Sequence, residues 1–181
     1  MFDRSLLPAV PGTYILELYL PRKRKITIGS LGEAIFPAGQ YLYCGSAHGA
    51  GGLQARLGRH LSGHGRVFWH IDYLRSVSQI TGFGFCCENN RLMQLVADQP
   101  RVPINHQVPL ECQLSQTLAS LPGSWIPLPG FGSSDCKSRC PAHFVGLSRE
   151  LHPNDFLETP SWLKDLNQSI RLTFFRWPRT T

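Results

Sequence analysis

The chain has 181 residues, 42% of them hydrophobic, with 18 lysines and arginines against 12 aspartates and glutamates. This length suits one well-buried domain and is short for two, so we predict a single domain over residues 1–181. The formal net charge of +6 favours a polyanionic partner.

The composition argues against export and against a membrane partner. The N-terminal residues lack the continuous apolar core of a signal peptide, so we expect a cytoplasmic protein whose six cysteines stay reduced. Residues 113–134 carry no charged side chain, but prolines and glycines interrupt them, so they cannot span a bilayer as one helix.

The first half of the chain predicts three strands. An apolar run from Thr13 to Leu20 is rich in strand-forming residues, and the cationic stretch 21–25 separates it from residues 26–28. This pattern predicts a β-hairpin with a cationic tip. A third strand is expected from Gln40 to Gly45, which would carry Tyr14 and Tyr43 on one antiparallel sheet.

Residues 52–62 are predicted to form a helix, because leucines at positions 53, 57 and 61 make one apolar stripe. At about 100° per residue, Arg56 and His60 lie together on the flank of that stripe, whereas Arg59 turns further toward solvent. Arg56 is therefore the better candidate for a cleft.

The rest of the chain alternates between the two kinds of element. We expect a strand at 79–86, a short helix at 90–98, a helix at 108–120 with Glu111 in its first turn, and strands at 142–147 and 170–177. The fold class predicted is therefore α+β, with a small, mostly antiparallel sheet flanked by helices.

Several of these residue types suit phosphodiester cleavage. The reaction needs an activated water, stabilisation of charge on the non-bridging oxygens, and help for the leaving alkoxide. Tyrosine, arginine and glutamate can supply all three. Each candidate also has a structural explanation, because strand tyrosines bury a ring and hydrogen-bond its tip, and a glutamate favours a helix N-terminus.

A series of short motifs runs along the chain in a fixed order: Gly12-x-Tyr14, Tyr41-x-Tyr43-x-Gly45-Ser46-Ala47, Arg59-His60, Trp69–Leu74, Glu111-Cys112 and Gly130–Cys136. Together they resemble the GIY-YIG nuclease superfamily, in particular the uncharacterised branch sometimes fused to endonuclease III-type glycosylases. The resemblance covers residues 10–147 and leaves 148–181 as a C-terminal extension around a GIY-YIG-like core.

This resemblance implies a metal-dependent endonuclease that hydrolyses DNA, with a place in repair or recombination. It implies that Tyr14 or Tyr43 is the base for the attacking water, that Arg56 contacts the phosphate with His60 beside it, and that Glu111 holds one Mg²⁺ or Mn²⁺ ion. Which tyrosine has which role stays open. A catalytically silent nucleic-acid-binding module is the alternative.

The expected contacts to nucleic acid come from two places. Gly45 and Ser46 are small enough for a phosphate to approach the backbone, and Arg59 follows on the next helix. Lys23 and Arg24, at the tip of the expected hairpin, could track the phosphate backbone, although a solvated turn explains them nearly as well.

The chain departs from the superfamily pattern at three points. Tyr14 and Tyr43 stand 29 positions apart, a wide gap that a longer hairpin would explain. Cys44 is the middle residue of the second motif, and Ser46 stands where many relatives have a lysine. The missing lysine removes one expected phosphate contact.

A histidine-rich stretch follows, with His60, His64, His70 and Asp72 close in sequence. These residues could bind a transition metal. We expect instead that His70 and Asp72 support the nuclease cleft, with Asp135 as a further supporting residue, because an aspartate commonly fixes the tautomer of a neighbouring histidine.

The last candidate is Cys136-x3-Cys140-x2-His143. Two thiolates and an imidazole suit structural Zn²⁺, but a closed site needs a fourth ligand, which Cys112 could supply only through the fold. Small buried thiols in a reducing cell are the favoured interpretation. A zinc-stabilised interaction protein is therefore a third, lower-ranked function.

Overall fold

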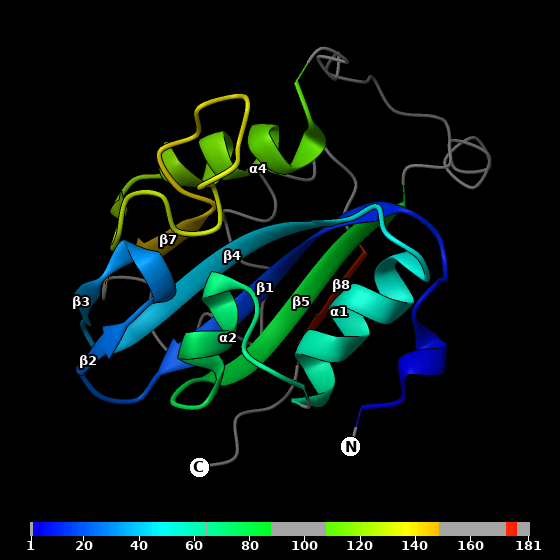
Figure 1. Ribbon diagram of the computed structural model, residues 1–181, viewed down its shortest axis with the longest axis horizontal. Helices are drawn as coiled ribbons and strands as arrows, with labels where there is room; N and C mark the ends of the chain where they lie inside the picture. Colours follow the sequence, from blue (N-terminus) through cyan, green and yellow to red (C-terminus); the bar gives the residue numbers. More distant parts are fainter. Residues whose placement is uncertain (1, 64, 88–107, 149–172, 177–181) are drawn as a thin grey trace.

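An antiparallel sheet of six strands forms the centre of the molecule in the computed structural model, which describes residues 2–63, 65–87, 108–148 and 173–176 (Figure 1). The strand order is β6-β7-β4-β1-β5-β8. The strands are β1 (Gly12–Leu20), β4 (Gly39–Ala47), β5 (Gln79–Cys87), β6 (Ser124–Trp125), β7 (Phe144–Leu147) and β8 (Thr173–Arg176).

Helices cover both faces of this sheet. On one face, α1 (Gly52–Ser62) and α2 (His70–Arg75) pack against Tyr14, Leu16 and Tyr43; on the other, α4 (Leu110–Ala119) packs against Ile15 and Leu42. Successive side chains of a strand point to opposite faces, so each central strand contributes to both core clusters. The predicted α+β class is confirmed.

The two motif tyrosines lie on neighbouring central strands. In the ladder between β1 and β4, Tyr14 stands opposite Gly45 and Leu16 stands opposite Tyr43. Gly45, the partner of Tyr14, is two positions from Tyr43 on β4, so the side chains of Tyr14 and Tyr43 point to the same face of the sheet. The expectation that one antiparallel sheet carries both rings is confirmed.

The predicted hairpin between residues 13–20 and 26–28 is wrong. Both edges of β1 are already paired, with β4 and β5, so no edge is left for the next segment. Instead β2 (Arg24–Thr27) pairs with β3 (Glu33–Phe36) in a separate two-stranded sheet, with the short 3-10 helix η2 (Gly29–Leu31) between them. This inserted hairpin accounts for the wide gap between the two motif tyrosines.

The remaining elements agree with the sequence pattern in type. Helix α1 has the predicted bounds, and β5, α4, β7 and β8 fall within a few residues of theirs. A 3-10 helix, η1 (Arg4–Leu6), together with α2 and β6, was not predicted. The expected helix at 90–98 lies outside the described residues, and none of the described helices is long and apolar enough to cross a membrane.

Candidate functional site

Three aromatic rings meet where β1, β4 and α1 come together. The ring centroids of Tyr14 and Tyr43 are 6.4 Å apart, and the His60 ring lies 5.8 Å from Tyr14 and 6.4 Å from Tyr43. All three side chains are almost completely buried. The turn spacing of α1 places His60 over the tyrosine pair, as its position beside the leucine stripe indicated.

The Tyr14 hydroxyl is buried and lies near Arg56, which acts to lower its pKa, but it makes no hydrogen bond of ordinary geometry to a described residue. Tyr41, two positions before Tyr43 on the same strand, instead donates to the backbone carbonyl of Pro37 at 2.6 Å. A tyrosine that serves packing normally pairs its tip in this way. Tyr14 therefore differs from a purely structural tyrosine.

Two arginines of α1 lie against one indole ring. The guanidinium carbon of Arg56 is 4.4 Å, and that of Arg59 4.5 Å, from the centroid of Trp69. Each contact is attractive, because the face of an aromatic ring is electronegative. The buried Nε of Arg56 has no hydrogen-bond partner within the described residues.

Asp72, on α2, contacts both Arg59 and His60 of α1. Its carboxylate lies 3.0 Å from Arg59 and 3.5 Å from His60 Nδ1, and it accepts the backbone N–H groups of Phe68 and Trp69 at 3.0 Å. The Arg59 side chain is 21% exposed, and Arg56 and Arg59 are both half-buried. The ion pair with Asp72 holds Arg59 against the protein.

The structure pairs Asp72 with His60 rather than with His70. The Nδ1 of His70 accepts the backbone N–H of Gly132 at 2.9 Å, which fixes the 131–143 loop. Burial lowers the pKa of His70, and the charge of Asp135 only partly opposes this. His64 lies outside the described residues. Within the described part, the histidines of this stretch join no group of three metal-donor side chains.

Burial sets the charge states of these rings. It raises the pKa of both Tyr14 and Tyr43 above the ordinary value, and the nearby Arg56 charge only partly opposes this. Burial also lowers the pKa of His60, although Asp72 acts in the opposite direction. At neutral pH the two phenols are therefore protonated and His60 is uncharged, with its Nδ1 facing Asp72 at 3.5 Å and its Nε2 making no hydrogen bond to a described residue.

Glu111 reaches the sheet from the α4 face, opposite the tyrosine face. Its Oε2 accepts the hydroxyl of Ser46 at 2.6 Å, and its Oε1 lies 3.1 Å from Nδ1 of His143. Strand β7 pairs with β4 only as far as Tyr43, so the Ser46 end of β4 is paired by β1 alone and leaves room for α4 to approach.

Glu111 is nevertheless part of the same electrostatic environment. Burial raises its pKa, but hydrogen bonds from His143 and Ser46 and the charge of Arg56 bring the pKa below its usual value. Conversely, the carboxylate raises the pKa of Tyr14 and Tyr43. The site thus combines an ionised glutamate with Arg56 across the end of β4.

The two small residues expected to approach a phosphate have other partners. A Cβ on Gly45 would collide with the ring and hydroxyl of Tyr14, so this glycine makes room for the tyrosine. Ser46 donates to Glu111. Both residues therefore help to position other side chains of the site, namely Tyr14 and Glu111.

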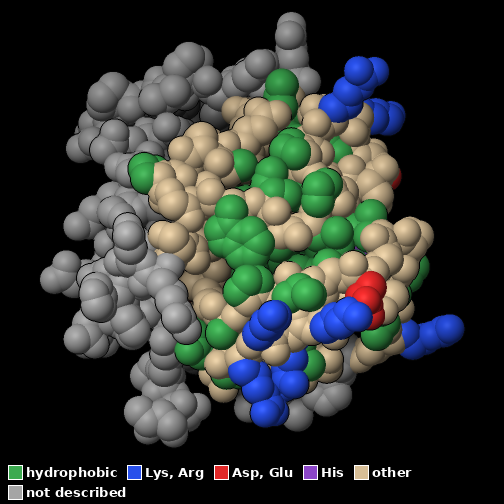
Figure 2. Space-filling view, turned by 90° about the vertical axis from the view of Figure 1, so that its left-hand side faces the viewer, with side chains coloured by type: hydrophobic (Ala, Val, Ile, Leu, Met, Phe, Trp, Pro, Cys, Tyr) green, Lys and Arg blue, Asp and Glu red, His purple; other side chains and the backbone are tan. Residues whose placement is uncertain are grey.

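The predicted cationic segment lies at the other end of the sheet. Leu20 ends β1 six residues after Tyr14, about 20 Å along the strand direction, and Lys23 and Arg24 follow that end. Lys23 is exposed and Arg24 is half-buried. Viewed from the β2–β3 end, several lysine and arginine side chains lie below and to the right of a cluster of hydrophobic side chains (Figure 2).

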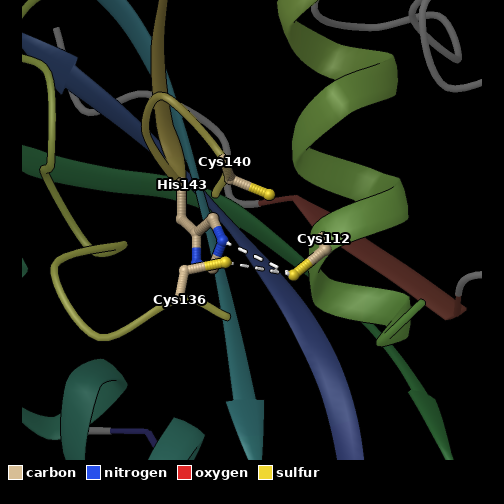
Figure 3. Close-up of side chains that lie close together, drawn as sticks. All are labelled: Cys112, Cys136, Cys140 and His143. Carbon is tan, nitrogen blue, oxygen red and sulfur yellow. Dashed lines mark hydrogen bonds between the residues drawn. The ribbon is translucent and has the colours of Figure 1, made fainter. Parts of the chain in front are cut away.

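A second cluster lies behind the sheet, between α4 and the loop before β7. Cys112, Cys136, Cys140 and His143 point toward one another (Figure 3), and their donor atoms all lie within 4.8 Å of one another. Such a group could hold a metal ion. Burial raises the pKa of the Cys136 thiol, but hydrogen bonds from Cys140, Cys112 and His143 outweigh it and bring the pKa to about 7.

Residues 13–161 match a family described as a domain of unknown function, DUF123. The chain belongs to the DUF123 family. This is a GIY-YIG-like family of unknown function, and the matched region contains both motif tyrosines, Arg56 and Glu111. No curated protein and no solved structure matches the chain.

Several contacts in this DUF123 chain were not visible in the sequence. Trp69 has the pattern of a core residue, yet it carries Arg56 and Arg59 on its ring. The pairing of Asp72 with His60 and the place of Cys112 beside Cys136 depend on how separate elements pack. A sequence signal existed for Asp72 alone, because an acidic residue three positions after the N-cap, here Trp69, is the second half of a capping box.

Proposed function

We propose that this DUF123 protein is a divalent-metal-dependent endonuclease that hydrolyses phosphodiester bonds of DNA. The observation that carries the proposal is a group of three buried polar atoms that make no hydrogen bond to a described residue, namely the Tyr14 hydroxyl, Arg56 Nε and His60 Nε2. Leaving buried polar atoms unpaired is costly, so three of them on one face favour a site that binds a polar ligand. A phosphodiester offers the matching oxygen atoms.

In this proposal Arg56 binds the non-bridging oxygens. A guanidinium can bind a phosphate through two parallel hydrogen bonds. The Trp69 ring packs against one side of the Arg56 guanidinium and would restrict its orientation. Negative charge on those oxygens grows as water attacks. A preorganised cation therefore stabilises the transition state more than the bound substrate.

His60, rather than either tyrosine, would take the proton of the attacking water. Its ring is uncharged at neutral pH because burial lowers its pKa, whereas burial raises the pKa of both phenols. Asp72, 3.5 Å from Nδ1, would stabilise the imidazolium that forms. Tyr14 would then orient the water through its hydroxyl.

Glu111 fits the expected Mg²⁺ or Mn²⁺ ion by its chemistry. Its carboxylate is ionised, and Mg²⁺ in proteins is commonly bound by one or two carboxylates together with waters and substrate phosphate. When bound, the ion would supply positive charge to the phosphoryl oxygens and the leaving alkoxide. The thiolates of the Cys112 cluster do not suit such a hard cation.

The decisive experiment is a single-turnover cleavage assay on labelled branched, flap and nicked DNA with Mg²⁺ or Mn²⁺. Arg56→Ala should lower the cleavage rate by about a hundredfold or more and keep most of the DNA affinity. Arg66→Ala is the matched control, because Arg66 is exposed and lies away from the tyrosine pair in sequence. Its cleavage rate should stay close to that of the unmutated chain.

Two results would count against the proposal. One is DNA binding without metal-dependent cleavage of any of these substrates, which would favour the silent binding module. The other is cleavage that Arg56→Ala leaves unchanged, which would place the reaction elsewhere.

A further inference from the structure

We propose that Cys112, Cys136, Cys140 and His143 form a closed structural zinc site that ties the first turn of α4 to the loop before β7. The four side chains come from two segments that are far apart in sequence (Figure 3). This inference does not depend on the proposed cleavage activity.

The spacing of the donor atoms matches tetrahedral coordination. Zinc bonds of roughly 2.3 Å to sulfur and 2.0–2.1 Å to nitrogen place two sulfurs about 3.8 Å apart, and a sulfur and a nitrogen about 3.6 Å apart. The observed separations are 3.5 Å between the sulfurs of Cys112 and Cys136, and 3.9 Å between Cys112 Sγ and His143 Nε2. One ion can therefore contact Cys112, Cys136 and His143 with little rearrangement, and Cys140, whose donor atom lies within 4.8 Å of the other three, would complete the site.

The donor set selects zinc over the ion proposed for Glu111. Three thiolates and one imidazole are typical of structural zinc, whereas Mg²⁺ and Mn²⁺ prefer oxygen. Cys112, Cys140 and His143 are buried, and four protein ligands leave no open position for substrate. On binding Zn²⁺, the three cysteines would release to solvent any thiol protons that they still carry, and the oxidation state of the metal would not change.

The ligand histidine is already oriented for this role. Its Nε2 faces Cys112 and its Nδ1 lies 3.1 Å from Oε1 of Glu111. A histidine that binds metal through one ring nitrogen usually donates the other N–H to a carboxylate or carbonyl. A further contact, from Nε2 of Gln116 to Sγ of Cys140 at 3.7 Å, supports the sulfur.

The loop before β7 is long and irregular, so a metal cross-link would restrict it further. Residues 126–143 contain no helix or strand, although irregular segments longer than about 12–15 residues are uncommon in compact domains. Arg139 has a φ of 52°, a left-handed conformation that non-glycine residues rarely adopt without a local constraint. The turn at Arg139 brings Cys140 back toward Cys136.

Zinc would also fix the position of Glu111. Cys112 follows Glu111 directly, and His143 contacts the Glu111 carboxylate, so the ion would hold this carboxylate beside Ser46. The zinc ion would therefore affect the tyrosine face only by fixing the position of Glu111, and it would take no part in the reaction itself.

Metal analysis of the purified full chain tests the proposal without any activity assay. Protein prepared under reducing conditions without chelator should contain about one zinc ion per chain. Cys112→Ser should lose most of this zinc. Cys87→Ser is the matched control, because Cys87 is a half-buried free cysteine outside the cluster, and its zinc content should match that of the unmutated chain.

Cobalt titration keeps the test valid if Cys112→Ser fails to fold. The unmutated chain, stripped of metal, should bind Co²⁺ with the intense visible bands of a tetrahedral thiolate site and lose them on adding Zn²⁺. Glu111→Gln should bind zinc about 10–100-fold more weakly while keeping the same spectrum. A metal-free chain that gives no tetrahedral cobalt spectrum, or that forms a Cys112–Cys136 disulfide in place of binding zinc, would overturn the proposal.

Discussion

Tyr14 stands opposite Gly45 in the ladder between β1 and β4, and its ring covers the space that a side chain on Gly45 would need. This relationship explains why the second motif has a glycine two positions after Tyr43 on β4. The glycine serves the position of the first motif, so the two motifs depend on each other through one cross-strand contact.

Gly45→Ala should therefore destabilise the fold. The added Cβ would collide with the Tyr14 hydroxyl end, and overpacking of a buried site costs about 1–3 kcal/mol of unfolding free energy. Urea unfolding followed by circular dichroism would measure this loss. Gly49→Ala is the matched control, because Gly49 is exposed and a Cβ there would meet open space, so its stability should change little.

Trp69 should act on cleavage through Arg56. Trp69→Leu removes the ring under both guanidinium groups, and a cation–π contact is worth about 0.5–2 kcal/mol. If the proposed cleavage is correct, the rate should fall roughly 3- to 30-fold while the fold persists, and Trp69→Phe should recover part of the loss. Trp125→Leu, at an exposed tryptophan of β6, should leave the single-turnover rate unchanged.

The charge on Asp72 predicts a pH-dependent stability. Burial raises its pKa, but His60, Arg59 and two backbone N–H groups lower it well below the ordinary value, and Arg75 also faces the carboxylate. A pKa lower in the folded than in the unfolded state means that the ionised group stabilises the fold above pH 4. This contribution is lost as the pH falls below about 4.

Asp72→Asn should consequently be less stable than the unmutated chain by about 1.5–3 kcal/mol at pH 7, the typical range for hydrogen bonds to a charged group. The difference should shrink as urea unfolding is repeated at pH values falling from 4 to 2. Glu33→Gln removes an exposed carboxylate from its contact with Lys25 and should have a much smaller effect. A difference between Asp72→Asn and the unmutated chain that is independent of pH would show that the carboxylate charge is not responsible.

The sequence predicted the elements well where local pattern decides them. Helix α1 follows from a leucine stripe, and β1, β4 and β5 follow from their apolar runs. It failed for the partner of β1, because strand pairing depends on which edges are free and not on which segments are consecutive. The neighbouring positions of residues 20 and 26 favoured a hairpin that the central place of β1 excludes.

Site residues were found from the sequence only where a motif contains them. Tyr14, Tyr43 and His60 came together because two strands and one helix pack in the usual order. Cys112 and Cys136 are on different segments, and only the approach of α4 to the loop brings their sulfur atoms to 3.5 Å. Contacts of this kind depend on long-range packing, which spacing along the chain does not record.

The last prediction concerns the reach of bound DNA. Lys23 is exposed and follows the end of β1, which lies about 20 Å from Tyr14, so DNA bound over both would extend along the direction of β1. If Lys23 contacts a phosphate, Lys23→Ser should lower the slope of log affinity against log salt by about 0.9. Lys25 is the control, since its ammonium lies 2.6 Å from Glu33, and Lys25→Ser should change the slope less. Equal slopes for the unmutated chain and Lys23→Ser would confine the DNA contact to the other end of the sheet.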